Sequence, residues 1–358
     1  MSRCLMVDIG AGTMDVLCHD DETGLHVKAV ARSPVLEISE RASALPGSLL
    51  VTGKEMGGGA LARILAKRAE TSEVVMTGSA SMTVHHDVDR VRSMGIRVVD
   101  DAEAEELTAT GRHSHLHLED LSRDRLERLV TSLGIPFDFD VMGVCAQDHG
   151  TPPRGVSHLD YRHRLFQDVL DGEALPHALL FADHEVPSTF NRLCSIAESA
   201  EEFPASEVYV MDSGMAAILG AAMDPEAQAS ERFMVLDIAT SHTVGAALIG
   251  LEIAGLFEYH TNDITLERLE ALLVDLAEGR LSHQQILSEG GHGAYVRKRI
   301  GYKSVECIVA TGPRRSLVLP SGLPIVWGAP FGDNMMTGTV GLLQAIRIRK
   351  GLEPIFVV

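Results

Sequence analysis

Short apolar runs recur along the chain, and most of them end in glycine, proline or small polar residues. Residues 4–7 and 14–17 form two such runs around a glycine-containing turn, which predicts two strands joined by a tight hairpin. Residues 25–31, 48–52, 73–77 and 97–99 are predicted as further strands, and residues 60–68 and 121–133 as helices. Because strands alternate with helices, the pattern predicts an α/β architecture.

The first turn carries groups that suit a phosphate. Gly10 and Gly12 lack a Cβ, so the backbone can turn its N–H groups towards an anion. Thr13 adds a hydroxyl donor, and Asp8 at the end of the first strand would hold Mg²⁺, usually through water. Asp15 would share that role or orient a nucleophile. An ordinary hairpin, whose glycines serve only the turn, explains the same residues.

The same layout returns in the second half of the chain. Residues 233–248 again place an apolar strand, an aspartate (Asp237), a turn with Thr240 and Ser241, and a second apolar strand in succession. Two equivalent turns predict two equivalent domains. Residues 211–221 and 331–345 are predicted as helices rich in small residues, and residues 307–315 as a strand that runs into a turn at Gly312.

Composition narrows the function classes. The chain has 358 residues, of which 45% are hydrophobic and 23% charged, and this balance is typical of a soluble protein of about two domains. A net charge of −19 argues against binding to nucleic acid or to anionic membranes. The first strand begins close to Met1, so we expect no signal peptide and a cytoplasmic location. The five scattered cysteines are expected to be reduced thiols.

Two apolar strands end in an aspartate–histidine pair. Residues 141–146 lead into Gln147, Asp148 and His149, and residues 179–182 lead into Asp183 and His184. Ligands of open α/β sheets bind beyond the carboxyl ends of strands, so we expect the two ends to meet at one substrate site. Asp148 is the predicted catalytic base, with His149 and His184 as neighbours. The alternative is that both are ordinary strand-ending turns.

A separate metal hypothesis concerns His113, His115 and His117. They alternate along a predicted strand and therefore share one face. Imidazoles in this arrangement can bind a metal, although a polar strand face with uncommitted histidines has the same pattern.

Taken in order, these segments resemble the superfamily of acetate and sugar kinases, heat-shock chaperone ATPases and actin (ASKHA). The resemblance covers nearly the whole chain: phosphate 1, a connecting helix, phosphate 2, an adenosine turn and a second connecting helix. It implies an α/β fold of two ribonuclease H-like (actin-like ATPase) domains around a central nucleotide cleft. It also implies ATP and Mg²⁺ as cofactors, bound by Asp8, Gly10, Gly12, Thr13 and Asp15 on one side, by Asp237, Thr240 and Ser241 on the other, and by Gly312 against the adenosine, with Asp8 and Asp237 at the metal.

The predicted domains are residues 1–222 with phosphate 1 and substrate-site insertions, residues 223–330 with phosphate 2 and the adenosine turn, and residues 331–358 returning to the first domain. The leading hypothesis is an ATP- and Mg²⁺-dependent kinase or ATPase acting on an unidentified small molecule or partner protein; a homodimer is also considered. The rival is a non-catalytic nucleotide-binding regulator that opens and closes on a partner. Ala239, where the superfamily usually has glycine, favours the rival, because its methyl group hinders close approach to phosphate.

Within the superfamily, residues 57–59 and 147–150 resemble a family labelled as pyruvate formate-lyase activating enzymes. Activases of that kind bind an iron–sulfur cluster through three closely spaced cysteines. No two cysteines of this chain are closely spaced, so we do not expect that chemistry here.

Overall fold

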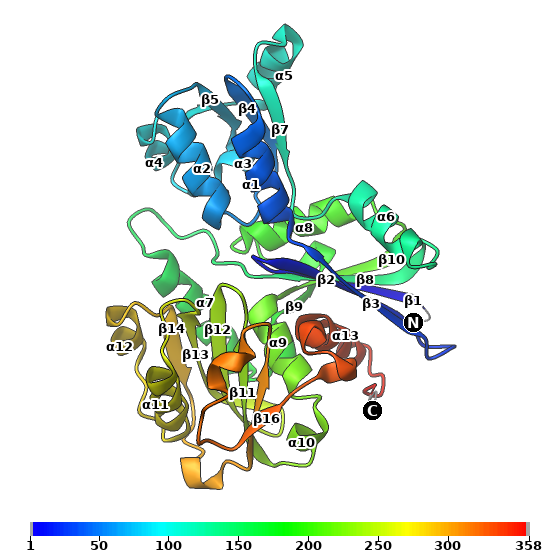
Figure 1. Ribbon diagram of the computed structural model, residues 1–358, viewed down its shortest axis with the longest axis vertical. Helices are drawn as coiled ribbons and strands as arrows, with labels where there is room; N and C mark the ends of the chain where they lie inside the picture. The colour runs from blue at the N-terminus through cyan, green and yellow to red at the C-terminus, as the bar shows by residue number, and fades with distance from the viewer. Residues whose placement is uncertain (1–2, 356–358) are drawn as a thin grey trace.

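Three β-sheets with helices on their faces build the molecule (Figure 1). The structure is a computed structural model, and it describes residues 3–355. Two of the sheets have six strands each, and the third has four. No helix within the described range is long and apolar enough to cross a membrane.

The first six-stranded sheet has the order β3-β2-β1-β8-β10-β9. Its first three strands are antiparallel, β8 and β10 run parallel to β1, and β9 runs antiparallel to β10. The apolar run of β1 is buried because the strand lies in the middle of the sheet. The strands are β1 (Arg3–Ile9), β2 (Thr13–Asp20), β3 (His26–Arg32), β8 (Phe139–Ala146), β9 (Leu180–Ala182) and β10 (Ala205–Asp212).

The second six-stranded sheet, β14-β13-β12-β11-β15-β16, repeats the order of the first five strands, but its sixth strand, β14, lies beside β13, at the opposite side from β9 in the first sheet. Strands β11 to β13 are antiparallel, and β15 and β16 run parallel to β11. Both sheets therefore have the ribonuclease H-like strand order, and the predicted fold class is confirmed. The strands are β11 (Arg232–Ile238), β12 (His242–Ile249), β13 (Glu252–His260), β14 (Gly293–Val296), β15 (Cys307–Thr311) and β16 (Ile325–Trp327).

A four-stranded parallel sheet, β6-β5-β4-β7, is inserted between β3 and β8 and has its own apolar core. It lies at the top of Figure 1. Its strands are β4 (Leu49–Gly53), β5 (Val74–Thr77), β6 (Arg97–Val99) and β7 (Ser114–Leu118), and its helices are α1 (Pro34–Ala44), α2 (Gly59–Ala69), α3 (Gly78–Ser81), α4 (Val88–Ser93) and α5 (Asp101–Thr110). The alternation of strands and helices in this region was predicted, but its separate sheet was not.

Helices α9 (Ser213–Ala221) and α13 (Thr337–Arg349) cross between the two large sheets. A Cβ on Gly341 would lie 1.8 Å from the Ala216 carbonyl oxygen, and one on Gly220 would lie 1.9 Å from that of Thr337. The small residues predicted for these helices thus allow two backbones to touch. The other helices are α6 (Arg123–Ser132), α7 (His158–Gly172), α8 (Asn191–Ala200), α10 (Pro225–Gln228), α11 (Leu266–Ala277) and α12 (His283–Ser288).

Both connecting helices begin later than predicted. Residues up to Asp212 belong to β10, and the Asp212 side chain caps α9 by accepting from the N–H groups of Gly214 and Met215. The C-terminal helix begins at Thr337 rather than at residue 331, because Phe331 has a positive φ of 55° and short 3-10 turns precede the helix.

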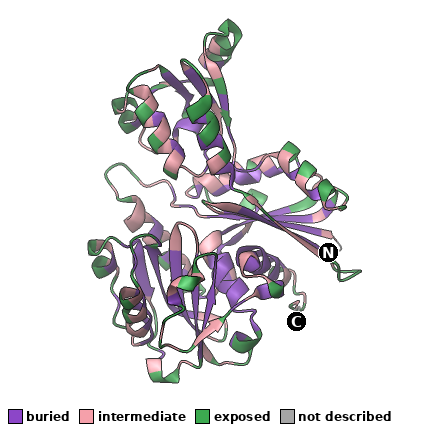
Figure 2. Ribbon diagram, viewed as in Figure 1, coloured by how far each residue is buried: buried purple, intermediate pink, exposed green. Residues whose placement is uncertain are grey.

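One apolar core joins the two large sheets. It contains the buried faces of β1, β8 and β10, helices α9 and α13, and inward-facing residues of β11 such as Phe233 and Val235. Figure 2 shows the strands of both sheets as mostly buried. The opposite face of the second sheet packs on α11 and α12 in a second core. The two turns at the ends of β1 and β11 are therefore held by a shared core.

Candidate functional site

The turns after β1 and β11 have the same geometry. Asp8 pairs with Asp15 across the first hairpin, and Asp237 occupies the equivalent position opposite Val244 in the second. Each turn is closed by the same 3.0 Å backbone hydrogen bond, from Gly10 to Thr13 in one and between the equivalent residues in the other. The predicted equivalence of the two turns thus holds for individual hydrogen bonds.

A hydroxyl residue beyond the third strand holds each turn from the side. The Ser33 hydroxyl donates to the Gly10 carbonyl at 2.7 Å, and its N–H donates to the Gly12 carbonyl at 3.1 Å. Thr261 makes the same two bonds, both at 2.9 Å, with the equivalent carbonyls of the second turn. The sequence analysis missed both residues, because neither lies within the turn that it supports.

The two turns face each other closely. A Cβ on Gly12 would lie 2.8 Å from the Thr240 hydroxyl oxygen. Within residues 3–355, the N–H groups of Ala11, Gly12, Thr240 and Ser241 make no hydrogen bond. Free backbone N–H groups on facing turns are what an anionic phosphate needs.

Buried carboxylates lie beneath the turns. Burial raises the pKa of Asp8 to about 7 against an opposing hydrogen bond from Cys145, and the nearby charge of Asp237 adds to the rise. Burial, followed by the charge of Asp8, raises the pKa of Asp15 to about 8. The Asp15 Oδ1 atom is buried without a hydrogen-bond partner. These carboxylates therefore lack compensating positive charge.

Asp237, in β11 of the second sheet, is the third carboxylate beside the turns. Burial raises its pKa to about 6, although the Thr311 hydroxyl donates to it at 2.8 Å. The three carboxylates fit Mg²⁺, because Mg²⁺ prefers oxygen ligands and Asp15 leaves a buried oxygen unpartnered. Asp8 and Asp237 would hold it from the two sides.

Two glycines let backbone approach these carboxylates. A Cβ on Gly338, in α13, would lie 2.0 Å from the Asp8 Oδ2 atom. Gly312 has a φ of +87°, and a Cβ there would lie 2.5 Å from the Ile238 carbonyl oxygen. Gly312 thus lies against the second turn, and only a residue without a side chain fits there; its contact with adenosine stays a prediction.

Arg162, in α7, joins the two domains beside the turns. Its guanidinium, 5% exposed, donates to Asp212 at 2.8 Å and to Glu258 of β13 at 3.2 Å. It also donates to the Asp148 carbonyl oxygen. Arg162 is therefore part of a buried ion-pair network.

Asp148 holds the backbone of its own loop. Its Oδ1 atom accepts from the Gly150 N–H at 2.7 Å, and its Oδ2 atom accepts from the Leu193 N–H at 2.9 Å. The residue is 2% exposed, and burial raises its pKa to about 6. Both oxygens are occupied, so the geometry gives Asp148 a structural task; its predicted role as a base stays a prediction.

His184 does not join Asp148. Strand β9 runs antiparallel to β10, whereas β8 runs parallel to it. The carboxyl ends of β9 and β8 therefore point in opposite directions along the sheet. His184 is exposed and bonds to its neighbour Asp183 at 2.8 Å. The expectation that the two strand ends meet at one site is therefore wrong, because the sequence does not reveal the direction of β9.

His149 instead meets histidines of the second domain. Its ring centroid lies 6.4 Å from that of His242 and 5.9 Å from that of His292. Burial lowers the pKa of His149 well below 6.5. The sequence analysis named His149 but not these two partners, which are distant in the chain.

The histidines in and just before β7 have other partners. His115 and His117 share the Thr52 hydroxyl, at 2.7 and 3.3 Å, and His113 contacts Glu73 at 3.0 Å. Among the described residues, the group of ligands close enough to hold one metal ion is His149, His242 and His292. The structure thus favours a polar strand face over the hypothesis of a metal site on β7.

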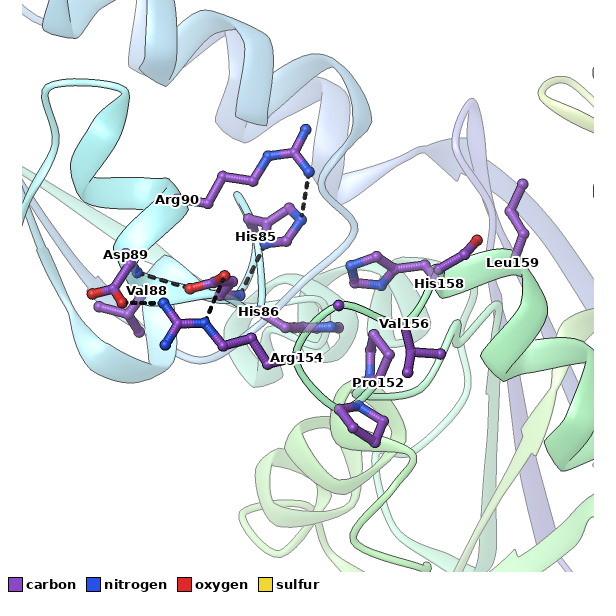
Figure 3. Close-up of a pocket in the computed structure, with 14 residues that line it drawn as sticks. His85, His86, Val88, Asp89, Arg90, Pro152, Arg154, Val156, His158 and Leu159 are labelled. Carbon is purple, nitrogen blue, oxygen red and sulfur yellow. Dashed lines mark hydrogen bonds and ion pairs between the residues drawn. The ribbon is translucent and has the colours of Figure 1, made fainter.

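A pocket of about 860 Å³ lies between the inserted domain and the loop before α7 (Figure 3). Its wall contains the rings of His85 and His158, whose centroids are 5.1 Å apart. Arg154 enters an ion pair with Asp89 at its rim. The pocket is lined by both apolar and polar side chains and lies outside the two turns.

Residues 56–317 match the model of the family described as "Putative pyruvate format-lyase activating enzyme (DUF1786)". A search of curated proteins found no match.

Among solved structures, the chain is similar to the PilM-PilN type IV pilus biogenesis complex, with 11% identity, a TM-score of 0.40, and coverage of 98% of this chain and 99% of that one. It is also similar to the ethanolamine utilization protein EutJ from Carboxydothermus hydrogenoformans, with 11% identity, a TM-score of 0.35, and coverage of 96% and 90%.

Proposed function

We propose that this chain, which belongs to the DUF1786 family, binds a nucleotide such as ATP, with Mg²⁺, between the turns after β1 and β11. The observation that carries the proposal is the set of free N–H groups on two facing turns, together with the buried carboxylate of Asp15 and the half-buried carboxylates of Asp8 and Asp237. The N–H groups suit phosphate oxygens, and the carboxylates suit a divalent cation. The two halves of the site complement a metal–polyphosphate complex.

Each residue of the two turns then has a role in the proposal. Gly10, Gly12 and Thr13 contact the phosphates from the first domain, and Thr240 and Ser241 do so from the second. Asp8 and Asp237 hold Mg²⁺, which neutralises phosphate charge when bound. Gly312 leaves room for the adenosine beside the second turn.

We propose phosphoryl transfer, by a kinase or an ATPase, as the reaction. Such chemistry depends mainly on positioning and charge neutralisation, which glycine turns and carboxylates supply. A base must accept a proton from the attacking hydroxyl or water. Asp15 is better placed for this than Asp148, because its Oδ1 atom is buried beside the turn and free of hydrogen bonds.

A non-catalytic nucleotide regulator is the second candidate. Ala239 places a methyl group in the second turn, and the turns already approach closely at Gly12 and Thr240. A nucleotide entering between them would have to separate the domains, and such an opening could signal to a partner.

The domain boundaries 1–222, 223–330 and 331–358 belong to the same proposal. Helix α9 ends at Ala221, β16 ends at Trp327, and α13 packs on β1 and β8. Opening of the cleft would move residues 223–330 relative to residues 1–222 and 331–358.

Calorimetric titration with ATP and Mg²⁺ tests the proposal. The wild-type protein should bind one nucleotide, and Asp8→Asn should lose the part of the affinity that depends on Mg²⁺. Asp183→Asn, at the opposite edge of the first sheet, is the matched control and should bind normally. Absence of binding in the folded wild-type protein would overturn the proposal. If the nucleotide binds, a hydrolysis assay separates an enzyme from a regulator.

A further inference from the structure

Four histidines from distant parts of the chain meet beside the second turn. His149 follows β8, His242 begins β12, His260 ends β13, and His292 precedes β14. The ring centroids of His242 and His292 are 4.6 Å apart, and those of His260 and His292 are 4.2 Å apart. His292 is buried, His149 and His242 are half-buried, and His260 is exposed; ring nitrogens that are buried without a partner are costly.

Three of these rings have nitrogens free to bind. The His242 Nδ1 atom lies 2.8 Å from the Ser241 hydroxyl oxygen, which leaves its Nε2 atom buried without a hydrogen-bond partner. The His292 Nε2 atom lies 2.9 Å from His260, which leaves its Nδ1 atom unpartnered, and His292 is only 8% exposed. His149 makes no hydrogen bond to any residue in the range 3–355.

The spacing of the three rings suits one metal ion. A ligand nitrogen from each of His149, His242 and His292 lies within 4.8 Å of the other two. Nitrogens at about 2.0–2.1 Å from a tetrahedral Zn²⁺ are about 3.3 Å apart. Small movements of the side chains would therefore bring all three to bonding distance.

We propose that His149, His242 and His292 bind a divalent transition metal of the Zn²⁺ class, with a fourth position open to water or to a substrate atom. Imidazole ligands select Zn²⁺ and its neighbours over Mg²⁺. Three protein ligands with an open position are typical of a catalytic rather than a structural site.

The surroundings of the cluster support this assignment. The second nitrogens of His242 and His292 are held by Ser241 and His260, and metal-binding histidines commonly have such an outer partner that fixes the ring. A Glu258 carboxylate oxygen lies 3.7 Å from the His292 Nδ1 atom. Its negative charge offsets the positive charge of the neighbouring Arg162 guanidinium beside the cluster.

Glu258 is itself held in place. Arg162 donates to its Oε2 atom at 3.2 Å, and the Gln147 amide donates to its Oε1 atom. The polar residues at the end of β8 thus reach the histidine cluster, which lies at the boundary between the two domains. The metal would sit next to the second turn, since His242 directly follows Ser241. The metal proposal does not require that a nucleotide binds.

Titration of chelator-treated protein with Co²⁺, without nucleotide, tests the proposal. One equivalent should bind, give visible absorption bands of an imidazole-ligated ion, and be displaced by Zn²⁺. His242→Gln and His149→Gln should each weaken binding at least about 100-fold, because each removes a ligand. The double variant His115→Gln/His117→Gln is the matched control and should bind one equivalent like wild type.

Near-ultraviolet circular dichroism checks that each variant is folded. If the His242 variant is not, His149→Gln decides, because His242 also contacts the Ser241 hydroxyl, whereas the His149 side chain has no hydrogen bond within residues 3–355. Failure of the wild-type protein to bind Co²⁺ or Zn²⁺ would overturn the proposal, as would unchanged binding in a folded His149→Gln variant. Neither result depends on whether ATP binds.

Discussion

Gly12 in the first turn and Thr240 in the second approach so closely that a Cβ on Gly12 would lie 2.8 Å from the Thr240 hydroxyl oxygen. The two residues are more than two hundred positions apart in the chain. They meet because one apolar core holds both sheets with their equivalent turns facing. This contact between the turns can be changed by single substitutions.

Gly12→Ala should weaken binding of ATP and Mg²⁺ at least about tenfold, which corresponds to about 1.4 kcal/mol. The added methyl group would fill the space between the turns, beside Thr240, and hinder the approach of phosphate oxygens to the free N–H groups. Removing the Thr240 hydroxyl and methyl groups in Gly12→Ala/Thr240→Ala should restore much of the affinity. Calorimetric titration measures each variant, with Thr240→Ala alone as the control; equal affinities of Gly12→Ala and wild type would contradict the prediction.

The buried carboxylates should make stability depend on pH. The pKa of Asp15 rises from 3.8 to about 8 on folding, so the folded state binds more protons than the unfolded state between these values. The free energy of unfolding should therefore be highest at acidic pH and fall as pH rises from about 4 to about 8. Relative to wild type, Asp15→Asn should gain at least about 1 kcal/mol between pH 5 and pH 8.

Urea unfolding at the two pH values measures this difference, and Asp183→Asn provides an exposed control. Saturating Mg²⁺ should reduce the fall of wild-type stability at high pH, because a bound cation compensates the carboxylates. A wild-type protein whose stability is the same at pH 5 and pH 8, with Mg²⁺ removed, would refute the interpretation of Asp8 and Asp15.

Arg162→Met should destabilise the protein by about 3–5 kcal/mol. The substitution leaves Asp212 and Glu258 buried without their shared cation. Chemical denaturation measures the loss, and Arg164→Met, an exposed position on the same helix, should change stability little. Similar stabilities of the two variants would show that the network contributes little to folding.

Gly341→Ala should destabilise the protein by at least about 2 kcal/mol or prevent folding, because its Cβ would lie 1.8 Å from the Ala216 carbonyl oxygen. The matched control is Gly172→Ala at the end of α7, where a Cβ meets no atom within 4 Å. This variant should keep or slightly raise the melting temperature. Thermal unfolding followed by circular dichroism compares the two, and equal melting temperatures would contradict the predicted contact between α9 and α13.

Much of the architecture follows from local sequence patterns. The hairpin around Gly10 and Gly12 and its repeat after Asp237 were predicted because each occupies about fifteen consecutive residues. Their apolar runs and turn residues act over short distances. The repeat predicted two equivalent domains, and each hairpin lies in a six-stranded sheet whose order shares five strands with the other.

The sequence alone determined that the chain is an α/β protein with two similar hairpins and two close-packing helices, since strand alternation and small residues are local features. Only the tertiary structure decided which distant groups meet. It put His184 at the opposite edge of the sheet from Asp148, because β9 runs antiparallel to β10. It also joined His149 to His242 and His292, because contacts between domains depend on how sheets pack, which no local pattern records.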